Sequence, residues 1–132
     1  MIGIGGAGMA PLAEILLEEG YALSGSDNNP SDTLEHIKSL GIPVYMGHHA
    51  ENLHGAEMVV HTAALLSDNP ELNAAKELGI PTFERAELFG AITRMYNNCI
   101  GICGTHGKTT TTSMLVQIML MADKDPTAVI GG

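Results

Sequence analysis

The order of apolar and polar residues along the first two thirds of the chain predicts strands that alternate with helices. Short apolar runs bounded by glycine, proline or polar residues are typical of strands buried in a sheet, and they occur at residues 1–5, 21–27, 42–47, 56–64 and 80–84. Apolar residues at helical spacing predict helices over residues 8–19, 32–40, 70–78 and 85–95, with a short helix or turn at 49–54.

Residues that start and end helices stand at the edges of these segments. Ser31 and Asp32 are N-cap candidates for the second helix, and Asn69 is the N-cap expected for the third. A glycine ends each of the first three helices, at Gly20, Gly41 and Gly79. Strands and helices that alternate with short connections predict an α/β fold, a Rossmann-like parallel sheet with helices on both faces.

The pattern changes at the polar segment Met95–Asn98, and we expect a domain boundary near residue 96. Residues 1–95 form the first predicted domain. Residues 96–132 are predicted to begin a second one, with a strand at 99–103, a glycine-rich loop, a helix over 108–122 and a strand in PTAVIGG, which runs from residue 126 to the last residue.

Composition narrows the classes of partner. Of 132 residues, 45% are apolar and 16% are charged, which is typical of a globular protein. A net charge of −9 without a basic stripe argues against nucleic acid as a partner. The apolar run at 114–122 is short and broken by Gln117, so we expect no membrane span. The first residues, MIGIGG, lack the charged start of a signal peptide, and we expect a cytoplasmic protein.

Two residue types in the second half are predicted to be buried. Cys99 and Cys103 do not have zinc-finger spacing, and reduced, buried thiols are the simpler expectation. Met114, Met119 and Met121 lie on the predicted last helix, where core packing is the expected role.

The first glycine-rich loop, GIGGAG at residues 3–8, follows a predicted strand and opens a helix. Glycines let the backbone approach a diphosphate, and the free N–H groups of a helix start attract it. Asp27 follows at the end of the second strand, where dinucleotide folds carry an acid for ribose hydroxyls. The alternative is a tight turn that only packs strand against helix. The motif by itself leaves NAD, FAD and other diphosphates open as ligands.

The second loop is GTHGKTTTT at residues 104–112. The strict phosphate-loop pattern requires a glycine where Ile102 stands, so it fails by one position. Its chemistry is retained: Gly107 permits a tight cradle, Lys108 can reach the β- and γ-phosphates of ATP, and the Thr109 hydroxyl can bind Mg²⁺. The alternative is a threonine-rich helix cap. His106 is either a supporting residue of the loop or a side chain tolerated there.

Several segments together resemble the Mur ligase family. They are GIGGAGM (3–9), SGSD (24–27), DNPE (68–71), GIP followed by RAE (79–87), GTHGKTTTT (104–112) and DPTAVIGG (125–132). The resemblance covers the whole chain. GIGGAGM points to the alanine-adding members. A related member that recycles a whole peptide has a similar ATP loop and looks less similar in the first loop.

The resemblance implies an ATP-dependent ligase of peptidoglycan synthesis with three domains. ATP, with Mg²⁺, would phosphorylate the carboxylate of UDP-N-acetylmuramate, and the amine of L-alanine would displace phosphate to form an amide. The chain would hold the UDP-binding domain and only the opening strand–helix–strand unit of a P-loop ATPase domain, so we expect it to be inactive alone. Upstream residues would also be missing.

The loops and the resemblance give two sets of candidate residues. The set expected at the UDP substrate is Gly5, Gly6, Ala7, Gly8, Met9, Ser26, Asp27, His48, Ala63 and Arg85. The set expected at ATP is Gly104, Thr105, His106, Gly107, Lys108, Thr109 and Thr110. Lys108 and Thr109 are the catalytic candidates, and Thr109 would bind Mg²⁺ together with ATP.

Each of these assignments has an alternative that involves no substrate or a different ligand. Arg85 could instead pair with Glu84 or Glu87, and the other histidines of the region, His49, His54 and His61, fit surface or loop positions better than a metal site. The chain could also be a stand-alone nucleotide-binding module for NAD(P) in which Gly-Lys-Thr is fortuitous. Such a module would have no need of a second phosphate loop.

Overall fold

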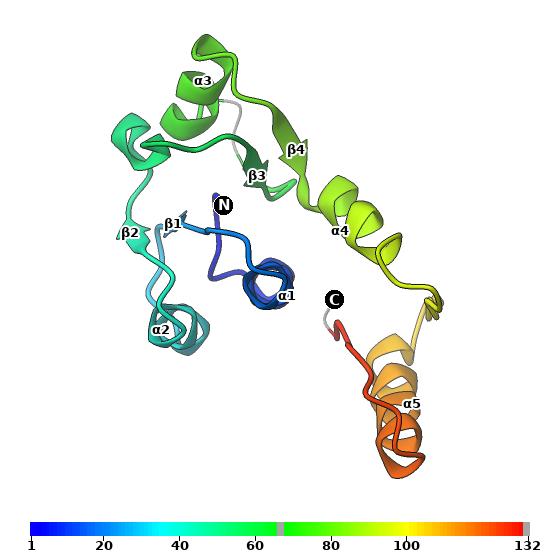
Figure 1. The fold of residues 1–132 in the computed structure, drawn as a ribbon. Coiled ribbons are helices and arrows are strands. Elements are labelled where there is room, and N and C mark those ends of the chain that lie inside the picture. Colours follow the sequence, from blue (N-terminus) through cyan, green and yellow to red (C-terminus); the bar gives the residue numbers. More distant parts are fainter. Residues whose placement is uncertain (66–67, 131–132) are drawn as a thin grey trace.

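The computed structural model describes residues 1–65 and 68–130, and it has an α/β fold with short parallel strands. Strand β1 (Gly25–Asp27) pairs in parallel with β2 (Val44–Met46), and β3 (Val59–His61) pairs in parallel with β4 (Thr82–Glu84). Ile2 joins the two pairs through parallel bridges to Ser26 and His61. The spatial order is therefore β2, β1, Ile2, β3, β4 (Figure 1), which is the order of the first five strands in doubly wound nucleotide-binding folds.

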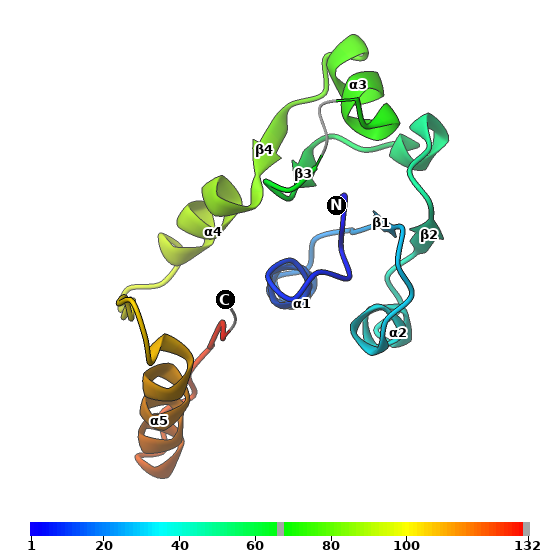
Figure 2. The same ribbon diagram turned by 180° about the vertical axis from the view of Figure 1, so that it is seen from behind.

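Each predicted helical segment contains a helix or 3₁₀ turn, with slightly narrower bounds than predicted (Figure 2). The observed elements are α1 (Ala10–Glu18), α2 (Asp32–Ser39), the 3₁₀ turn η1 (Ala50–Leu53), α3 (Pro70–Glu77), α4 (Arg85–Thr93) and α5 (Lys108–Met121). The strands are shorter than predicted, and the first one, expected over residues 1–5, is reduced to the bridges of Ile2.

Three apolar clusters fill both faces of the strand layer. One joins α1 to α4 through Val60, and a second joins α1 to α2 around Ile4. The third joins α3 and the turn η1 to Ile2 and Val59. Because neighbouring residues of a strand point to opposite faces, Val59 and Val60 contact different clusters. Helices α1, α2 and α4 thus cover one face of the layer, and α3 covers the other.

Two of the expected helix starts are confirmed by hydrogen bonds. The Ser31 hydroxyl accepts from the backbone N–H of Leu34 at 3.1 Å, so Ser31 rather than Asp32 is the cap of α2. The Asn69 side chain accepts from the backbone N–H groups of Glu71 and Leu72 at 3.0 and 3.1 Å. Each cap satisfies N–H groups that the first turn of a helix leaves without partners.

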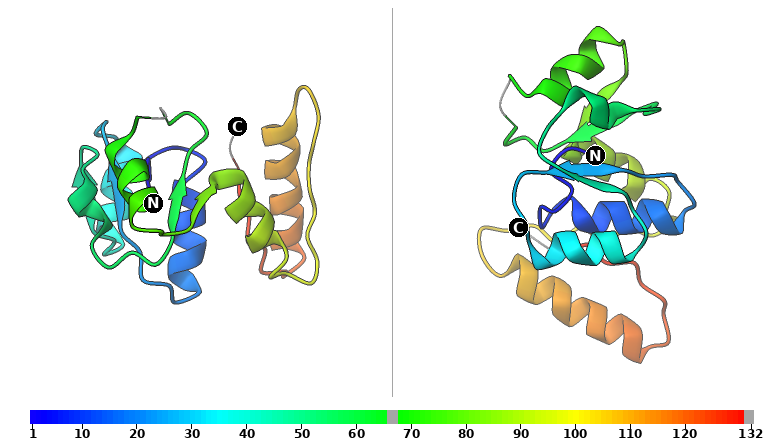
Figure 3. Two further views of the ribbon diagram at one scale, coloured as in Figure 1. Left: turned by 90° about the horizontal axis from the view of Figure 1, so that it is seen from above. Right: turned by 90° about the vertical axis from the view of Figure 1, so that its left-hand side faces the viewer.

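The segment after residue 96 agrees only in part with its prediction. Helix α5 is present, but residues 99–103 and 126–130 form no strand, and the last two residues of the predicted strand, Gly131 and Gly132, lie outside the described part. A strand requires a neighbour for its backbone N–H and C=O groups, and neither segment pairs with one among the described residues. The strand–helix–strand unit is therefore seen only as its helix (Figure 3).

Burial in this segment also differs from expectation. No residue of α5 is buried: Met114 is 62% exposed and Met121 is 86% exposed. Cys99 and Cys103 are exposed as well. The predictions of buried thiols and of core methionines on the last helix were wrong, because no sheet covers this helix among the described residues.

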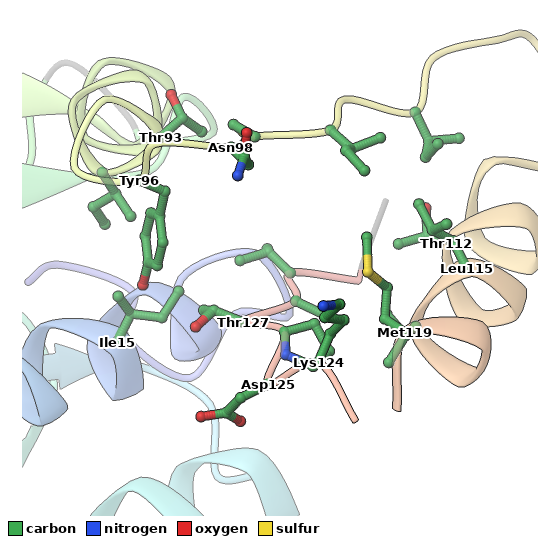
Figure 4. Close-up of a pocket in the computed structure, with 18 of the residues that line it drawn as sticks. Ile15, Thr93, Tyr96, Asn98, Thr112, Leu115, Met119, Lys124, Asp125 and Thr127 are labelled. Atoms are coloured by element: carbon green, nitrogen blue, oxygen red, sulfur yellow. The ribbon is translucent and has the colours of Figure 1, made fainter. Parts of the chain in front are cut away.

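A large cavity of about 910 Å³ separates α5 from the first unit (Figure 4). The cavity is lined by Ile15 of α1, by Tyr96, which follows α4, and by Met119 of α5. Val129, near the end of the chain, packs against the apolar cluster that joins α1 and α4. The cavity lies apart from the first glycine loop and reaches Thr112, the last residue of the second. No helix in the described residues is long and apolar enough to cross a membrane.

Candidate nucleotide site

The first glycine loop is tied to strand β1 and opens directly into α1. Gly3 has a left-handed backbone (φ +78°), which a residue with a side chain rarely adopts. The N–H groups of Gly3 and Ile4 both donate to the carbonyl of Ser26, at 2.8 and 3.1 Å. Further along, the N–H of Gly6 donates to the carbonyl of Gly3, and that of Met9 to the carbonyl of Gly6. The loop is therefore fixed by its own backbone bonds.

Two loop amides are left over. Among the described residues, the N–H groups of Ala7 and Gly8 donate to no protein acceptor. They stand just before α1, where the helix dipole adds partial positive charge. Free amides at a helix start are suited to an anion such as a phosphate.

Asp27 holds the same loop from the end of β1. Its Oδ2 accepts from the N–H of Gly5 at 2.9 Å, and its Oδ1 accepts from the N–H of Asn29 at 3.0 Å. A β-carbon on Gly5 would stand 3.0 Å from Asp27 Oδ2, so glycine at this position permits the close approach. Each carboxylate oxygen retains a second lone pair, which is still available to a ligand hydroxyl.

Arg85 brings a positive charge to the loop. This residue opens α4, is exposed, and lies so close to the loop that a β-carbon on Gly8 would stand 2.8 Å from Arg85 Nη1. The alternative pairing does not occur: no ion pair links Arg85 to Glu84 or Glu87, and the side chain of Glu87 instead accepts from the N–H of Glu84 at 2.8 Å. The guanidinium and the free amides of Ala7 and Gly8 therefore lie in one neighbourhood.

His48 belongs to a polar cluster that the sequence did not reveal. Its Nδ1 lies 3.1 Å from the Oγ of Ser26 and 3.4 Å from Oε2 of Glu71. The Ser26 hydroxyl donates to Glu71 Oε2 at 2.6 Å, and the side-chain amide of Asn52 donates to Glu71 Oε1. Glu71 is 1% exposed. A glutamate in the first turn of a helix is common because it complements the helix dipole, so nothing in the sequence indicated that this one is buried.

The remaining residues of the first set lie around the same loop. Met9 is buried in the cluster that joins α1 and α4, and thus serves as core. Ala63 is exposed in a turn after β3. The neighbouring Thr62 lies against the loop, since a β-carbon on Gly3 would stand 3.0 Å from its Cγ2. Gly5, Gly6, Gly8, Ser26, Asp27, His48 and Arg85 are thus brought to the edge where the parallel strands end.

The second loop is built around Gly107 and Lys108. Gly107 has a left-handed backbone (φ +76°) and precedes α5. The ammonium of Lys108 donates to the carbonyl of Gly104 at 2.9 Å, so the side chain folds back over the loop. The N–H of Thr111 donates to the carbonyl of Gly107, which makes it the first intrahelical bond. The N–H groups of Lys108, Thr109 and Thr110 precede that bond and have no acceptor within the helix.

The other members of the second set are exposed. Thr105, His106, Thr109 and Thr110 all face solvent. In residues 1–65 and 68–130, the Thr109 hydroxyl makes no hydrogen bond to protein, whereas that of Thr112 donates to the carbonyl of Lys108 at 2.8 Å. No group of three or more His, Cys, Asp or Glu residues in the same ranges could hold a metal ion. This loop can thus offer amides, one ammonium and one free hydroxyl to a polyphosphate.

A family model matches the first part of the chain. The model described as "Mur ligase family, catalytic domain" matches residues 1–97. Among curated proteins, the UDP-N-acetylmuramate–L-alanine ligase of Acetivibrio thermocellus is 53% identical over 99% of the chain. The chain spans 28% of the length of that relative.

Solved structures agree with this similarity. The UDP-N-acetylmuramate–alanine ligase of Thermotoga maritima superposes with a TM-score of 0.90 over 95% of the chain, at 32% identity, and the chain covers 29% of it. The UDP-N-acetylmuramate:L-alanyl-γ-D-glutamyl-meso-diaminopimelate ligase of Neisseria meningitides superposes with a TM-score of 0.84 over 92% of the chain, at 33% identity, and the chain covers 38% of it.

Proposed function

The chain belongs to the Mur ligase family, and from that premise we propose that it is the amino-terminal part of a cytoplasmic ligase that joins L-alanine to UDP-N-acetylmuramate in peptidoglycan synthesis. In this proposal residues 1–95 bind the UDP end of the substrate, and residues 96–132 begin the ATP-binding domain. The identity of 53% to an alanine ligase over nearly the whole chain supports the choice of reaction.

The observation that carries the proposal is the anion site at the first loop. The free amides of Ala7 and Gly8, the start of α1 and the guanidinium of Arg85 lie together. This combination of backbone donors and one planar cation is suited to a diphosphate. We assign Gly5, Gly6, Ala7, Gly8 and Arg85 to the pyrophosphate of UDP.

The sugar and base of the ligand then have neighbours at the same edge. We assign Asp27 and Ser26 to the side of the ribose, and His48 to the uridine. Ala63 lies in the turn after β3 and completes this assignment. Met9 supports the loop from the core rather than by contact, because it is 1% exposed.

The second loop supports the ATP assignment. We propose that the amides of Lys108, Thr109 and Thr110, with the loop residues Gly104, Thr105, His106 and Gly107, hold the phosphates. Lys108 would leave the carbonyl of Gly104 to bind the β- and γ-phosphates. The free hydroxyl of Thr109 fits a ligand of Mg²⁺, which offsets charge on the transferring phosphoryl group when bound.

The reaction proceeds in two steps. The substrate carboxylate attacks the γ-phosphorus of ATP, the bond to the bridging oxygen breaks, and ADP leaves. Lys108 stabilises the charge that builds on the phosphoryl oxygens. The amine of L-alanine then attacks the acyl carbon, inorganic phosphate leaves, and the amine loses a proton as the amide forms. Because the chain spans 28% of the length of the alanine ligase that it resembles, we propose that L-alanine binds elsewhere in the complete ligase and expect no ligation by the chain alone.

A second candidate function is the peptide-recycling reaction of the same family. The peptide ligase of Neisseria meningitides is as similar in sequence as the solved alanine ligase, 33% against 32%. The names of both ligases include UDP-N-acetylmuramate, so binding of that sugar nucleotide does not separate the two reactions, although the GIGGAGM loop favours the alanine ligase. Formation of product from L-alanine but not from a tripeptide, by the complete ligase, decides between them.

Calorimetry on the 132-residue chain tests the first domain. UDP, UDP-N-acetylmuramate and NADH are titrated separately, and NADH represents the alternative class of ligand, the dinucleotides. We expect both uridine compounds to bind and NADH to bind more weakly. Tighter binding of NADH than of the sugar nucleotide would favour a dinucleotide module and contradict the proposal.

A further inference from the structure

Glu71 is a carboxylate buried beside the proposed uridine site, and none of the roles assigned so far uses it. Glu71 is 1% exposed, and its position on α3 is fixed because Asn69 caps the helix and accepts from its N–H at 3.0 Å. No Lys or Arg pairs with it among the described residues. A buried carboxylate without a cation is costly unless hydrogen bonds hold it, and Glu71 has a donor on each oxygen.

The donors on Glu71 fix the direction of every bond in the cluster. Asn52 Nδ2 also lies 3.0 Å from the carbonyl oxygen of Gly47, which can only accept. The amide of Asn52 must therefore point its NH₂ toward Glu71 Oε1 as well. On the other oxygen, the single proton of the Ser26 hydroxyl goes to Glu71 Oε2 at 2.6 Å.

These bonds determine which ring nitrogen of His48 carries a proton. Because the Ser26 hydroxyl donates its one proton to Glu71, the Ser26 Oγ can only accept from His48 Nδ1, which lies 3.1 Å away. Glu71 Oε2, at 3.4 Å from the same nitrogen, also favours a proton there. The proton of a neutral His48 must then be on Nδ1, and Nε2 is the nitrogen without a protein partner among the described residues. The His48 side chain is still 13% exposed.

We propose that Glu71 is a positioning residue of the UDP site: through Ser26 it fixes the Nδ1–H tautomer of His48, so that Nε2 presents a lone pair to an N–H or O–H donor of the bound uridine. This inference rests on the proposed function for its ligand. The same Ser26 accepts from the N–H groups of Gly3 and Ile4 through its carbonyl, so the cluster also adjoins the phosphate loop.

The other charged group near Glu71 is the amino group of Met1, which donates to the carbonyl of Ser24 at 2.7 Å. Burial lowers its pKa, and the charge of Glu71 opposes that shift. Because this group has no hydrogen bond to His48, the tautomer is decided by Ser26 and Glu71.

Glu71→Gln reverses the polarity of the cluster without changing its shape. The orientation of Asn52 keeps the carbonyl oxygen of the new amide on its own side, which places the new NH₂ beside Ser26. Ser26 then accepts from the glutamine and gives its proton to His48 Nδ1. Neutral His48 is thereby converted to the Nε2–H tautomer, which offers the ligand a donor in place of an acceptor. Glu77→Gln is the matched control, since Glu77 is an exposed residue of the same helix and loses the same charge.

Nitrogen-15 NMR of the histidine rings and calorimetry with UDP test the proposal on the 132-residue chain. In the wild-type chain we expect the neutral ring of His48 to carry its proton on Nδ1 and to leave Nε2 without one. Glu71→Gln should give the Nε2–H form and weaken UDP binding by about tenfold, the effect of one mismatched buried hydrogen bond. Glu77→Gln should leave both unchanged.

The outcomes separate this inference from the proposed function. A wild-type His48 with its proton on Nε2 overturns the tautomer assignment, and this result needs no variant that folds. A tautomer reversed in Glu71→Gln with unchanged UDP affinity overturns the positioning role. A wild-type chain that shows the Nδ1–H form but does not bind UDP contradicts the proposed function and leaves the assigned tautomer in place.

Discussion

The side chain of Arg85, the first residue of α4, lies over the backbone of Gly8, just before α1. A β-carbon placed on Gly8 would stand 2.8 Å from Arg85 Nη1 and 3.1 Å from its Cζ. The contact brings the guanidinium to the free amides of the first loop. It also explains why this loop position is suited to glycine, because any larger residue would displace the cation.

Replacement of that cation should weaken binding of the diphosphate. We expect Arg85→Ala to reduce the affinity for UDP by roughly tenfold to a hundredfold, since hydrogen bonds to charged groups are among the stronger ones. Arg94→Ala is the control, because it removes an exposed arginine from the other end of α4. Calorimetry with UDP measures both. An equal loss in the two variants would mean that only net charge matters.

Ile4 packs so closely on Gly25 that any side chain at position 25 should destabilise the fold. A β-carbon on Gly25 would stand 2.5 Å from Ile4 Cδ1, and Ile4 is fully buried. We expect Gly25→Ala to lower the free energy of unfolding by about 1–3 kcal/mol through overpacking. Gly101→Ala, where nothing lies within 4 Å, should change it by less than about 0.5 kcal/mol. Urea denaturation followed by circular dichroism gives both values.

The cap of α3 should contribute measurably to stability. Asn69→Ala removes the acceptor of two backbone N–H groups, those of Glu71 and Leu72, and we expect a loss of about 1 kcal/mol in the free energy of unfolding. Asn73→Ala alters an exposed residue of the same helix and should be nearly neutral. If the two variants unfold at the same urea concentration, the cap bonds are not significant in solution.

Lys108 should separate the two nucleotide sites in the complete ligase. Lys108→Ala is expected to abolish formation of the acyl phosphate, because Lys108 is the one lysine or arginine of the second loop and Mg²⁺ alone would not replace its charge on the transferring phosphoryl group. The affinity for UDP-N-acetylmuramate should change little, since that ligand is assigned to the first loop. Phosphate release and calorimetry measure the two effects. A comparable loss of both would show that the sites are not separable.

The helices were predicted well because their signals are local. Apolar spacing and the caps Ser31 and Asn69 are read within a few residues, and the structure confirms both caps. The strands and the burial of α5 were predicted less well, since a strand depends on partners far along the chain. Residues 99–103 have the composition of a strand but no neighbour to pair with among the described residues.

The two glycine loops and the alternation of strands and helices can be predicted from the amino-acid sequence, because spacing and backbone freedom are properties of short segments. The surroundings of the first loop depend on the tertiary fold. Parallel pairing brings the ends of separate strands and the following helices to one edge, and so places Glu71 on Ser26 and Arg85 on Gly8. These contacts join residues far apart in the chain, so no local pattern contains them.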